Sequence, residues 1–166
     1  YYMFNGRTIL ITGAASGLGR AWAEGFSADG ATVVAADIDG EGLKKVPARF
    51  HLTVDVSDSN QVEQMILDSI EQTGRIDVLF NNAGVGFNKR LENSSKGDFE
   101  QHIAVHLFAM VNAIRAAIPF MRTQNYGRII NTISRNAEYD VVGTSAYAAA
   151  KAAIWAASRV TAAELH

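Results

Sequence analysis

Three side chains in the second half of the sequence have the types and spacing of a proton-transfer group. Tyr147 lies four residues before Lys151, and Ser134 lies thirteen residues before Tyr147. Four residues is about one helical turn, so a phenol and an ammonium at this spacing share a helix face. A free tyrosine has a pKa of about 10, but a neighbouring ammonium favours the phenolate. We predict that Tyr147 transfers a proton and that the neighbouring Lys151 lowers the pKa of its phenol. For such a pair alone, two side chains on a solvated helix face are the alternative.

A glycine-rich turn near the amino end has the composition of a phosphate-binding site. Residues 8–12 are apolar and β-branched, which predicts a buried strand, and residues 20–26 have helical periodicity. Between them stands Gly-Ala-Ala-Ser-Gly-Leu-Gly, residues 13–19. Glycines permit a sharp turn, and the free N–H groups at a helix start attract an anion. The spacing differs from Gly-x-Gly-x-x-Gly, and a tight turn without a ligand is the alternative.

An acidic residue after the next strand indicates which dinucleotide would bind. Asp37 directly follows an apolar run at residues 31–36. A carboxylate about 20 residues past a phosphate-binding turn suits free ribose hydroxyls and repels a 2′-phosphate. No arginine or lysine stands in the turn or directly after Asp37. We predict NAD as the cofactor, with NADP possible; an acidic strand end facing water is the alternative.

The composition excludes several other classes of protein. The chain has 166 residues, 48% of them hydrophobic, a formal net charge of −2 and no cysteine. Disulfides and thiolate metal sites are therefore excluded, and nothing basic indicates nucleic acid. His102 and His106 are four residues apart, but no glutamate stands between them, so no metal site is predicted. No apolar run approaches about 18 residues, which predicts no membrane-spanning helix. A cytoplasmic location is expected.

Strands and helices alternate along the sequence. We predict strands at residues 8–12, 32–36, 50–54, 78–81 and 128–133, and helices at residues 17–28, 40–46, 60–73, 96–122 and 144–165. Asp58 and Gln61 indicate the start of the third helix, and Gly74 its end. Such alternation predicts an α/β fold: one domain, residues 1–166, with a doubly wound parallel sheet of the Rossmann type. The expected strand order is 3-2-1-4-5, with ligand at the carboxyl ends of the strands.

Taken together, these motifs resemble the short-chain dehydrogenase/reductase family. The matching pieces occur in the family's order over nearly the whole chain: residues 12–19, Asp37, Asp55-Val56, Asn81–Gly84, Ser134 and Tyr147-Ala-Ala-Ala-Lys151. The resemblance implies an NAD(P)-dependent oxidoreductase that transfers a hydride between nicotinamide and a secondary alcohol or ketone. Tyr147 would be the general acid/base, Lys151 would bind the nicotinamide ribose, and Ser134 would orient the substrate. The other cofactor-binding residues would be Gly13, Ser16, Gly17, Leu18, Gly19, Asp37, Asp55, Val56, Asn81, Ala83 and Gly84.

Two features depart from the family pattern. His106 stands in Val-His-Leu, where the family has an asparagine that anchors a water of the proton relay. His106 either takes over this catalytic role or slows the relay. The sequence ends fifteen residues after Lys151, before the family's later strands and substrate-covering helices, so we expect its C-terminal substrate-binding segment to be absent. A nucleotide-binding or assembly module without turnover is therefore the alternative function.

The remaining expectations concern substrate and assembly. The loop at residues 136–142 would contact a small alcohol or carbonyl substrate, with Tyr139 joining Ser134 and Tyr147. Helices 96–122 and 144–165 carry many alanines, and in the family such helices pair across a two-fold axis. We therefore predict a homodimer or homotetramer.

Overall fold

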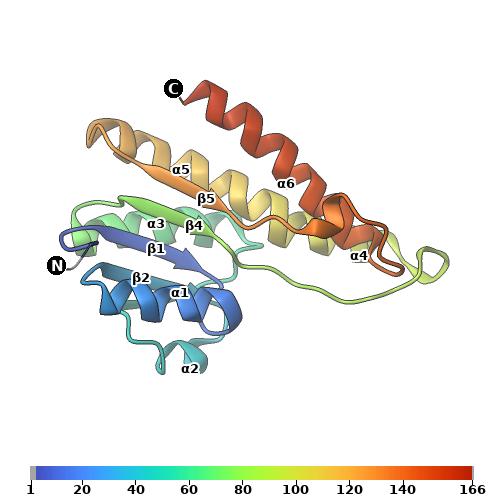
Figure 1. Cartoon of the computed structure of the whole chain (residues 1–166), viewed down its shortest axis with the longest axis horizontal. Coiled ribbons are helices and arrows are strands. Elements are labelled where there is room, and N and C mark those ends of the chain that lie inside the picture. Colours follow the sequence, from blue (N-terminus) through green and yellow to red (C-terminus); the bar gives the residue numbers. More distant parts are fainter. Residues whose placement is uncertain (1–2, 166) are drawn as a thin grey trace.

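Five parallel strands form the centre of the computed structural model, which describes residues 3–165 (Figure 1). The strands are β1 (Thr8–Thr12), β2 (Thr32–Asp37), β3 (Phe50–Thr53), β4 (Val78–Asn81) and β5 (Arg128–Asn131). Their order is β3-β2-β1-β4-β5, and every neighbouring pair is parallel. The central strand sets the register, since Leu10 lies beside Val34 on one side and Leu79 on the other. The predicted fold class and strand order are confirmed.

Helices cover both faces of this sheet. They are α1 (Gly17–Ala28), α2 (Gly40–Leu43), α3 (Ser59–Thr73), α4 (Lys96–His102), α5 (Ala109–Thr123) and α6 (Ser145–Glu164). Short 3₁₀ turns occupy Leu91–Asn93 and Arg135–Ala137. The third helix begins and ends as predicted: Asp58 Oδ1 accepts from the N–H groups of Asn60 and Gln61, and Gly74 ends the helix at φ 75°. A left-handed conformation at this point favours glycine.

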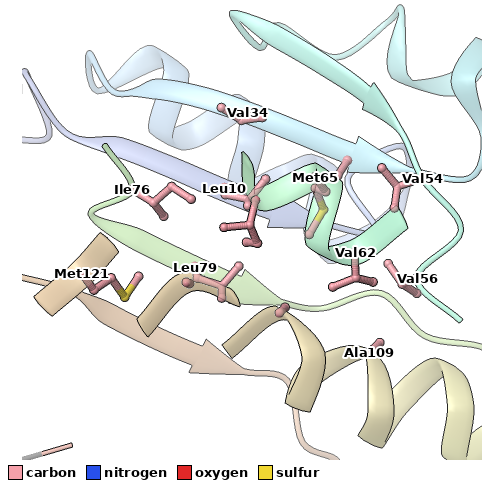
Figure 2. Close-up of a cluster of buried hydrophobic side chains, with 14 residues drawn as sticks. Leu10, Val34, Val54, Val56, Val62, Met65, Ile76, Leu79, Ala109 and Met121 are labelled. Atoms are coloured by element: carbon pink, nitrogen blue, oxygen red, sulfur yellow. The ribbon is translucent and has the colours of Figure 1, made fainter. Parts of the chain in front are cut away.

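Alternate side chains of the strands build two separate cores. Leu10, Val34 and Leu79 face α3 and α5, where Met65 packs on them (Figure 2). On the opposite face, Ile9, Ile11, Val33 and Ala35 pack with residues of α1 and α2. Successive side chains of a strand point to opposite faces, so a strand covered on both sides must be apolar throughout. All five residues of β1 are buried, as this requires.

The long helix after β4 differs from the prediction. Residues 96–122 were expected as one α-helix, but a π-helical segment (Ile103–Phe108) separates α4 from α5. The hydrophobic pattern does not reveal where the backbone hydrogen bonds change from the α-helical i→i+4 to the π-helical i→i+5 spacing. Such segments occur often at functional sites. β5 is also shorter than predicted, ending at Asn131, because β4 itself ends at Asn81 and no neighbouring strand continues beside it.

The same stretch is apolar enough to resemble a membrane-spanning helix, which was not expected from the sequence. By length and composition alone, Lys96–Thr123 is a candidate span, with a mean hydropathy of 1.6 over 18 residues. Core helices of globular proteins pass the same test. Here Ala109, Ala113, Ala117 and Met121 belong to the core beneath the sheet. The packing therefore accounts for the apolar side chains on the face of this helix that is buried.

Candidate active site and cofactor cleft

A cavity of about 1020 Å³ lies where the strands end at their carboxyl side. It brings together most of the residues that the sequence indicated, from six separate segments of the chain. Those that line it are Gly13, Ser16, Gly17, Leu18, Asp37, Asp55, Val56, Ala83, Gly84, His106, Tyr147 and Lys151. Ligand sites of open α/β sheets lie at this edge, next to the strand where the order reverses. Gly19, Asn81, Ser134 and Tyr139 are not part of this lining.

The glycine-rich turn needs its glycines for two reasons. Gly13 has φ 68° and Gly17 has φ 52°, both in the left-handed region. A Cβ at Gly13 would lie 2.8 Å from Cα of Ala83, so the backbone after β4 leaves no room for a side chain there. Ser16 is the N-cap of α1, and its side chain accepts no capping hydrogen bond. The Ser16 side chain therefore occupies none of the first N–H groups of α1, and Gly17 and Leu18, which carry two of them, line the cavity. Such free N–H groups are potential anion ligands.

Asp37, the last residue of β2, is held by hydrogen bonds from two backbone N–H groups, one of which belongs to the glycine-rich turn. Its Oδ2 accepts from the N–H of Ala15 at 2.9 Å, and its Oδ1 accepts from the N–H of Asp39 at 2.9 Å. A carboxylate has about four acceptor positions. The two bonds therefore orient Asp37 and leave each oxygen able to accept from a ligand hydroxyl.

Asn82, which was not predicted as a site residue, connects the ends of β1 and β5 through hydrogen bonds. Asn82 Nδ2 donates to the carbonyls of Thr12 (3.1 Å) and Gly13 (3.3 Å), and its Oδ1 accepts from Thr132 Oγ1 at 3.2 Å. Thr12 Oγ1 accepts from the N–H groups of Asn82 and Ala83. Two adjacent asparagines after a strand were a signal for this role. Asn81 instead braces the sheet, since its Nδ2 donates to Asn131 Oδ1 at 2.8 Å.

Tyr147 and Lys151 lie side by side on α6, as their spacing predicted. Lys151 Nζ is 5.7 Å from the centre of the Tyr147 ring. The lysine is 4% exposed, and Nζ donates to the carbonyl oxygen of Thr132 at 2.8 Å. Burial lowers the pKa of Lys151 to about 8, because the charged form loses hydration. An ammonium has three donors, so this buried group keeps donor capacity for a ligand.

His106 lies on the π-helical segment against the turn that follows β4. Its ring is 3% exposed, and Nε2 lies 2.7 Å from the carbonyl oxygen of Val85. A Cβ at Gly84 would lie 2.5 Å from Cε1 of His106, so only glycine permits this approach. Burial, and then the charge of Lys151, lower the pKa of His106 to about 4. His106 is therefore neutral near pH 7, and it reaches the cavity beside Lys151.

Two predicted substrate residues lie elsewhere. Ser134 begins the 3₁₀ turn after β5, where its Oγ accepts from the N–H of Asn136 at 3.2 Å. Tyr139 is 53% exposed and lies under the guanidinium of Arg135, 4.6 Å from the ring centre. It borders a neighbouring groove, whereas Asn136 of the same loop lines the main cavity.

The sequence did not predict one further part of the cavity lining. Phe87 and Asn88 follow the Asn-Asn-Ala-Gly segment, and Glu100 and Ala104 precede His106 on the same helical stretch. The available signal was that Glu100 and Ala104 are four residues apart, a spacing that places them on one helix face. Among residues 3–165, no three histidine, aspartate or glutamate side chains lie close enough together to hold a metal ion.

Comparison with known proteins identifies relatives of this arrangement. A family model described as short chain dehydrogenase matches residues 7–166. The 3-oxoacyl-[acyl-carrier-protein] reductase FabG of Thermotoga maritima is 34% identical over 96% of this chain and 68% of its own length. Levodione reductase of Leifsonia aquatica is also 34% identical, over 97% of this chain and 64% of its own. The chain thus spans about two thirds of the length of these relatives.

Solved structures show the same likeness. NAD⁺-bound xylitol dehydrogenase has a TM-score of 0.93 at 30% identity, covering 98% of this chain and 66% of its own. 7α-Hydroxysteroid dehydrogenase, complexed with NADH and 7-oxo glycochenodeoxycholic acid, has a TM-score of 0.94 at 27% identity, over 99% of this chain and 67% of its own. With the family model matching nearly the whole chain, these likenesses show that the chain belongs to the short-chain dehydrogenase family.

Proposed function

We propose that this chain carries the cofactor and proton-transfer sites of an NAD-dependent oxidoreductase that interconverts a secondary alcohol and a ketone. One observation carries the proposal. A single cavity holds a glycine turn at a helix start, a backbone-fixed carboxylate at one end, and Tyr147 beside a buried Lys151 at the other. This is the order of groups that a dinucleotide and a carbonyl substrate together require.

The residues present fit a nicotinamide dinucleotide. The N–H groups at the start of α1 would bind the pyrophosphate, where Gly13 has no room for a side chain and leaves the backbone open. Asp37 would accept from the hydroxyls of the adenosine ribose, and Lys151 would donate to the nicotinamide ribose. Asp55 and Val56 line the same cavity and would flank the adenine. When bound, the nicotinamide supplies or accepts the hydride, which no side chain of this protein can do.

The chain itself would move one proton. In the direction of carbonyl reduction, Tyr147 Oη gives its proton to the substrate oxygen as negative charge develops there. The ammonium of Lys151 stabilises the phenolate that remains, and its own burial strengthens this interaction. Ser134, whose hydroxyl caps the 3₁₀ turn after β5, would donate a hydrogen bond to the substrate oxygen. His106, neutral and next to Lys151, would bind the water that returns a proton to the site.

The charges of the cavity favour NAD over NADP. In the proposed binding mode Asp37 would lie beside the ribose position that carries the 2′-phosphate of NADP. Lys151 is the only lysine or arginine among the described residues that line the cavity. A phosphate at this end would face a carboxylate with no cation to offset it. The solved structures of NAD⁺-bound xylitol dehydrogenase and of 7α-hydroxysteroid dehydrogenase with NADH support the same choice.

A nucleotide-binding module without turnover is the second candidate. The observation in its favour is that Ser134 does not line the cavity next to Tyr147. The two functions differ in whether bound NADH is consumed, so they separate in one experiment.

The test measures binding and turnover in the full protein. NADH is titrated by fluorescence, and oxidation of NADH is then followed with a panel of ketones that includes cyclic diketones, keto sugars and steroid ketones. We expect NADH to bind and at least one ketone to be reduced. Tyr147→Phe should lower kcat by about 10³-fold, with the Kd for NADH within twofold. Tyr126→Phe, whose ring stacks under Arg7, is the matched control and should keep full activity.

Each outcome decides between the candidates. Binding without reduction of any ketone supports the module, whereas failure to bind NADH contradicts both proposals. Full activity of Tyr147→Phe would contradict the acid–base role of the phenol.

For assembly, we propose that copies of this chain pair through the long helices. Phe108 and Trp155, which are exposed on these helices, support the proposal. Sedimentation measures the oligomeric state.

A further inference from the structure

His102, which ends α4, is a fully buried imidazole with one nitrogen unpaired. Its side chain has 0% exposure, and Nδ1 lies 2.8 Å from the carbonyl oxygen of Asp98. A carbonyl only accepts, so Nδ1 must carry the hydrogen, and Nε2 is left with a bare lone pair. Among residues 3–165, no group donates to Nε2. Buried polar atoms without a partner are rare in folded proteins, so this nitrogen requires an explanation.

His106 presents a second nitrogen of the same kind, four residues further along the chain. Its Nε2 lies 2.7 Å from the carbonyl oxygen of Val85 and 3.3 Å from the Val85 N–H. The shorter contact favours Nε2 as the donor to the carbonyl, which leaves Nδ1 as the bare acceptor. In the described part of the chain, this Nδ1 is also buried without a partner. Burial and the charge of Lys151 keep the ring neutral. The rings that carry these two acceptors have their centres 5.8 Å apart, and within residues 3–165 no protein group donates to either nitrogen.

Both imidazoles stand against the ring of Tyr147. The two rings are nearly parallel, at 18° and 5.8 Å between centres. Each meets Tyr147 edge to face, His102 at 82° and 6.1 Å, and His106 at 85° and 5.4 Å. On its other side, His102 contacts Phe87 of the cavity wall at 4.5 Å. His102 therefore contacts both the ring that carries the proposed acid and Phe87 of the cavity lining.

We propose that His102 is a positioning residue of the reaction proposed above, and that its Nε2 and His106 Nδ1 together bind one buried water molecule that fixes the ring of Tyr147. A water molecule has two O–H donors, so one molecule satisfies both nitrogens. Its remaining lone pairs accept from donors nearby, and Lys151, which lines the cavity beside His106, has N–H groups to offer. The ligand class follows from the lone pairs: a cation would be repelled by Lys151, and an apolar group would leave both nitrogens unpaired.

Three substitutions of His102 separate the role of the nitrogen from that of the ring. His102→Phe keeps the ring but loses both nitrogens. His102→Gln places an amide oxygen near the position of Nε2, and His102→Asn places an amide N–H near that of Nδ1. If Nε2 positions Tyr147 through the water, Phe and Asn should lower kcat about tenfold, Gln should stay within about threefold, and the Kd for NADH should remain within twofold in all three. His51→Phe, where Nε2 pairs with the carbonyl of Val46 far from the cavity, is the matched control.

The kcat values of the His102 variants either support the proposal or overturn it. Unchanged kcat in His102→Phe would overturn the proposal, because the ring alone would then suffice. Gln impaired as strongly as Phe would overturn it too, because an acceptor at this position would not restore function. Circular dichroism on each variant identifies any that fail to fold, and the measurement below then decides.

Nuclear magnetic resonance of the unmodified protein needs no turnover. With ¹⁵N-labelled histidine, long-range ¹H–¹⁵N spectra near pH 7 should show His102 protonated at Nδ1 and His106 at Nε2. Their other nitrogens should have the shifts of acceptors that receive a hydrogen bond. A doubly protonated ring, or a bare nitrogen with no hydrogen bond, would overturn the proposal. If no ketone is reduced, the oxidoreductase function fails, while this spectrum still decides whether the water site exists.

Discussion

Two buried charges stand at opposite ends of the same sheet and are treated in opposite ways. Asp77, at the amino end of β4, has a fully buried side chain whose oxygens accept from Arg7, from Arg75 and from the N–H of Thr8, at 2.6–2.9 Å. Lys151, at the carboxyl end of the sheet, is also buried but has one protein partner, the carbonyl of Thr132. The hydrogen bonds of Asp77 are complete, whereas those of Lys151 are not.

We interpret this difference as that between a structural charge and one that is kept for the proposed cofactor. Burial by itself would raise the pKa of Asp77, but hydrogen bonds from Arg75, Thr8 and Arg7 outweigh it and hold the pKa below its usual range. At Lys151, burial is the only cause of the shift, and it lowers the pKa to about 8. An incompletely bonded buried ion costs stability, and it persists where a ligand completes its bonds. Unused hydrogen-bonding capacity therefore marks the site.

The sharpest test of this contrast is Lys151→Met. We expect kcat to fall by about 10³-fold, because the phenolate of Tyr147 loses its neighbouring charge. The free energy of unfolding should not fall, because the variant removes a buried ion that lacks partners. Steady-state kinetics and urea unfolding measure the two quantities. Lys45→Met, at an exposed lysine, is the control and should change neither. Marked destabilisation of Lys151→Met would break the comparison.

Asp77→Asn should give the opposite result. We expect the free energy of unfolding to fall by about 2–3 kcal/mol, because the arginines lose a buried charged partner. Both arginines are more than 40% exposed, and water therefore limits the loss. Activity at 25 °C should stay within twofold, since Asp77 lies at the far end of the sheet. Urea unfolding with Asp29→Asn as an exposed control measures the effect; a large loss of kcat without destabilisation would contradict a purely structural role.

A smaller effect is expected at the cofactor end. In Asp37→Ser, NADH should bind about tenfold more weakly, because the ribose hydroxyls lose a charged acceptor. NADPH should bind at least as well as it does to the natural protein, since the repelling carboxylate is gone. Fluorescence titration with both cofactors gives the ratio of their Kd values. An unchanged ratio would show that Asp37 does not face the ribose.

The smallest expected signal is the pH dependence of the Asp77 contribution. Its folded pKa lies below the unfolded value of about 3.9. The contribution is therefore fully present above about pH 4 and is lost as pH falls through the folded pKa. The difference in unfolding free energy between the natural protein and Asp77→Asn should thus shrink as pH drops from 5 toward 2. A difference that stays constant over this range would mean that the pKa of Asp77 is not depressed.

Local patterns predicted the elements that depend on neighbours in sequence. The bounds of β1 and β4 follow from short apolar runs, and α3 from its capping residues. The Tyr147 and Lys151 pair was also predictable, because four residues on a helix always share a face. The network of Thr12, Asn82 and Thr132 was not, because its members are up to 120 residues apart and meet only where β1, β4 and β5 end together.

The sequence by itself determined the alternation of strands and helices, the glycine turn, the carboxylate after β2 and the spacing on α6, since each depends on backbone conformation within a few residues. Only the tertiary structure decided that Lys151 is buried with donors to spare, that Asp77 is fully bonded, and that His102 and His106 enclose Tyr147 through a π-helical segment. These depend on which side chains burial brings together and on how many hydrogen bonds it leaves unmade.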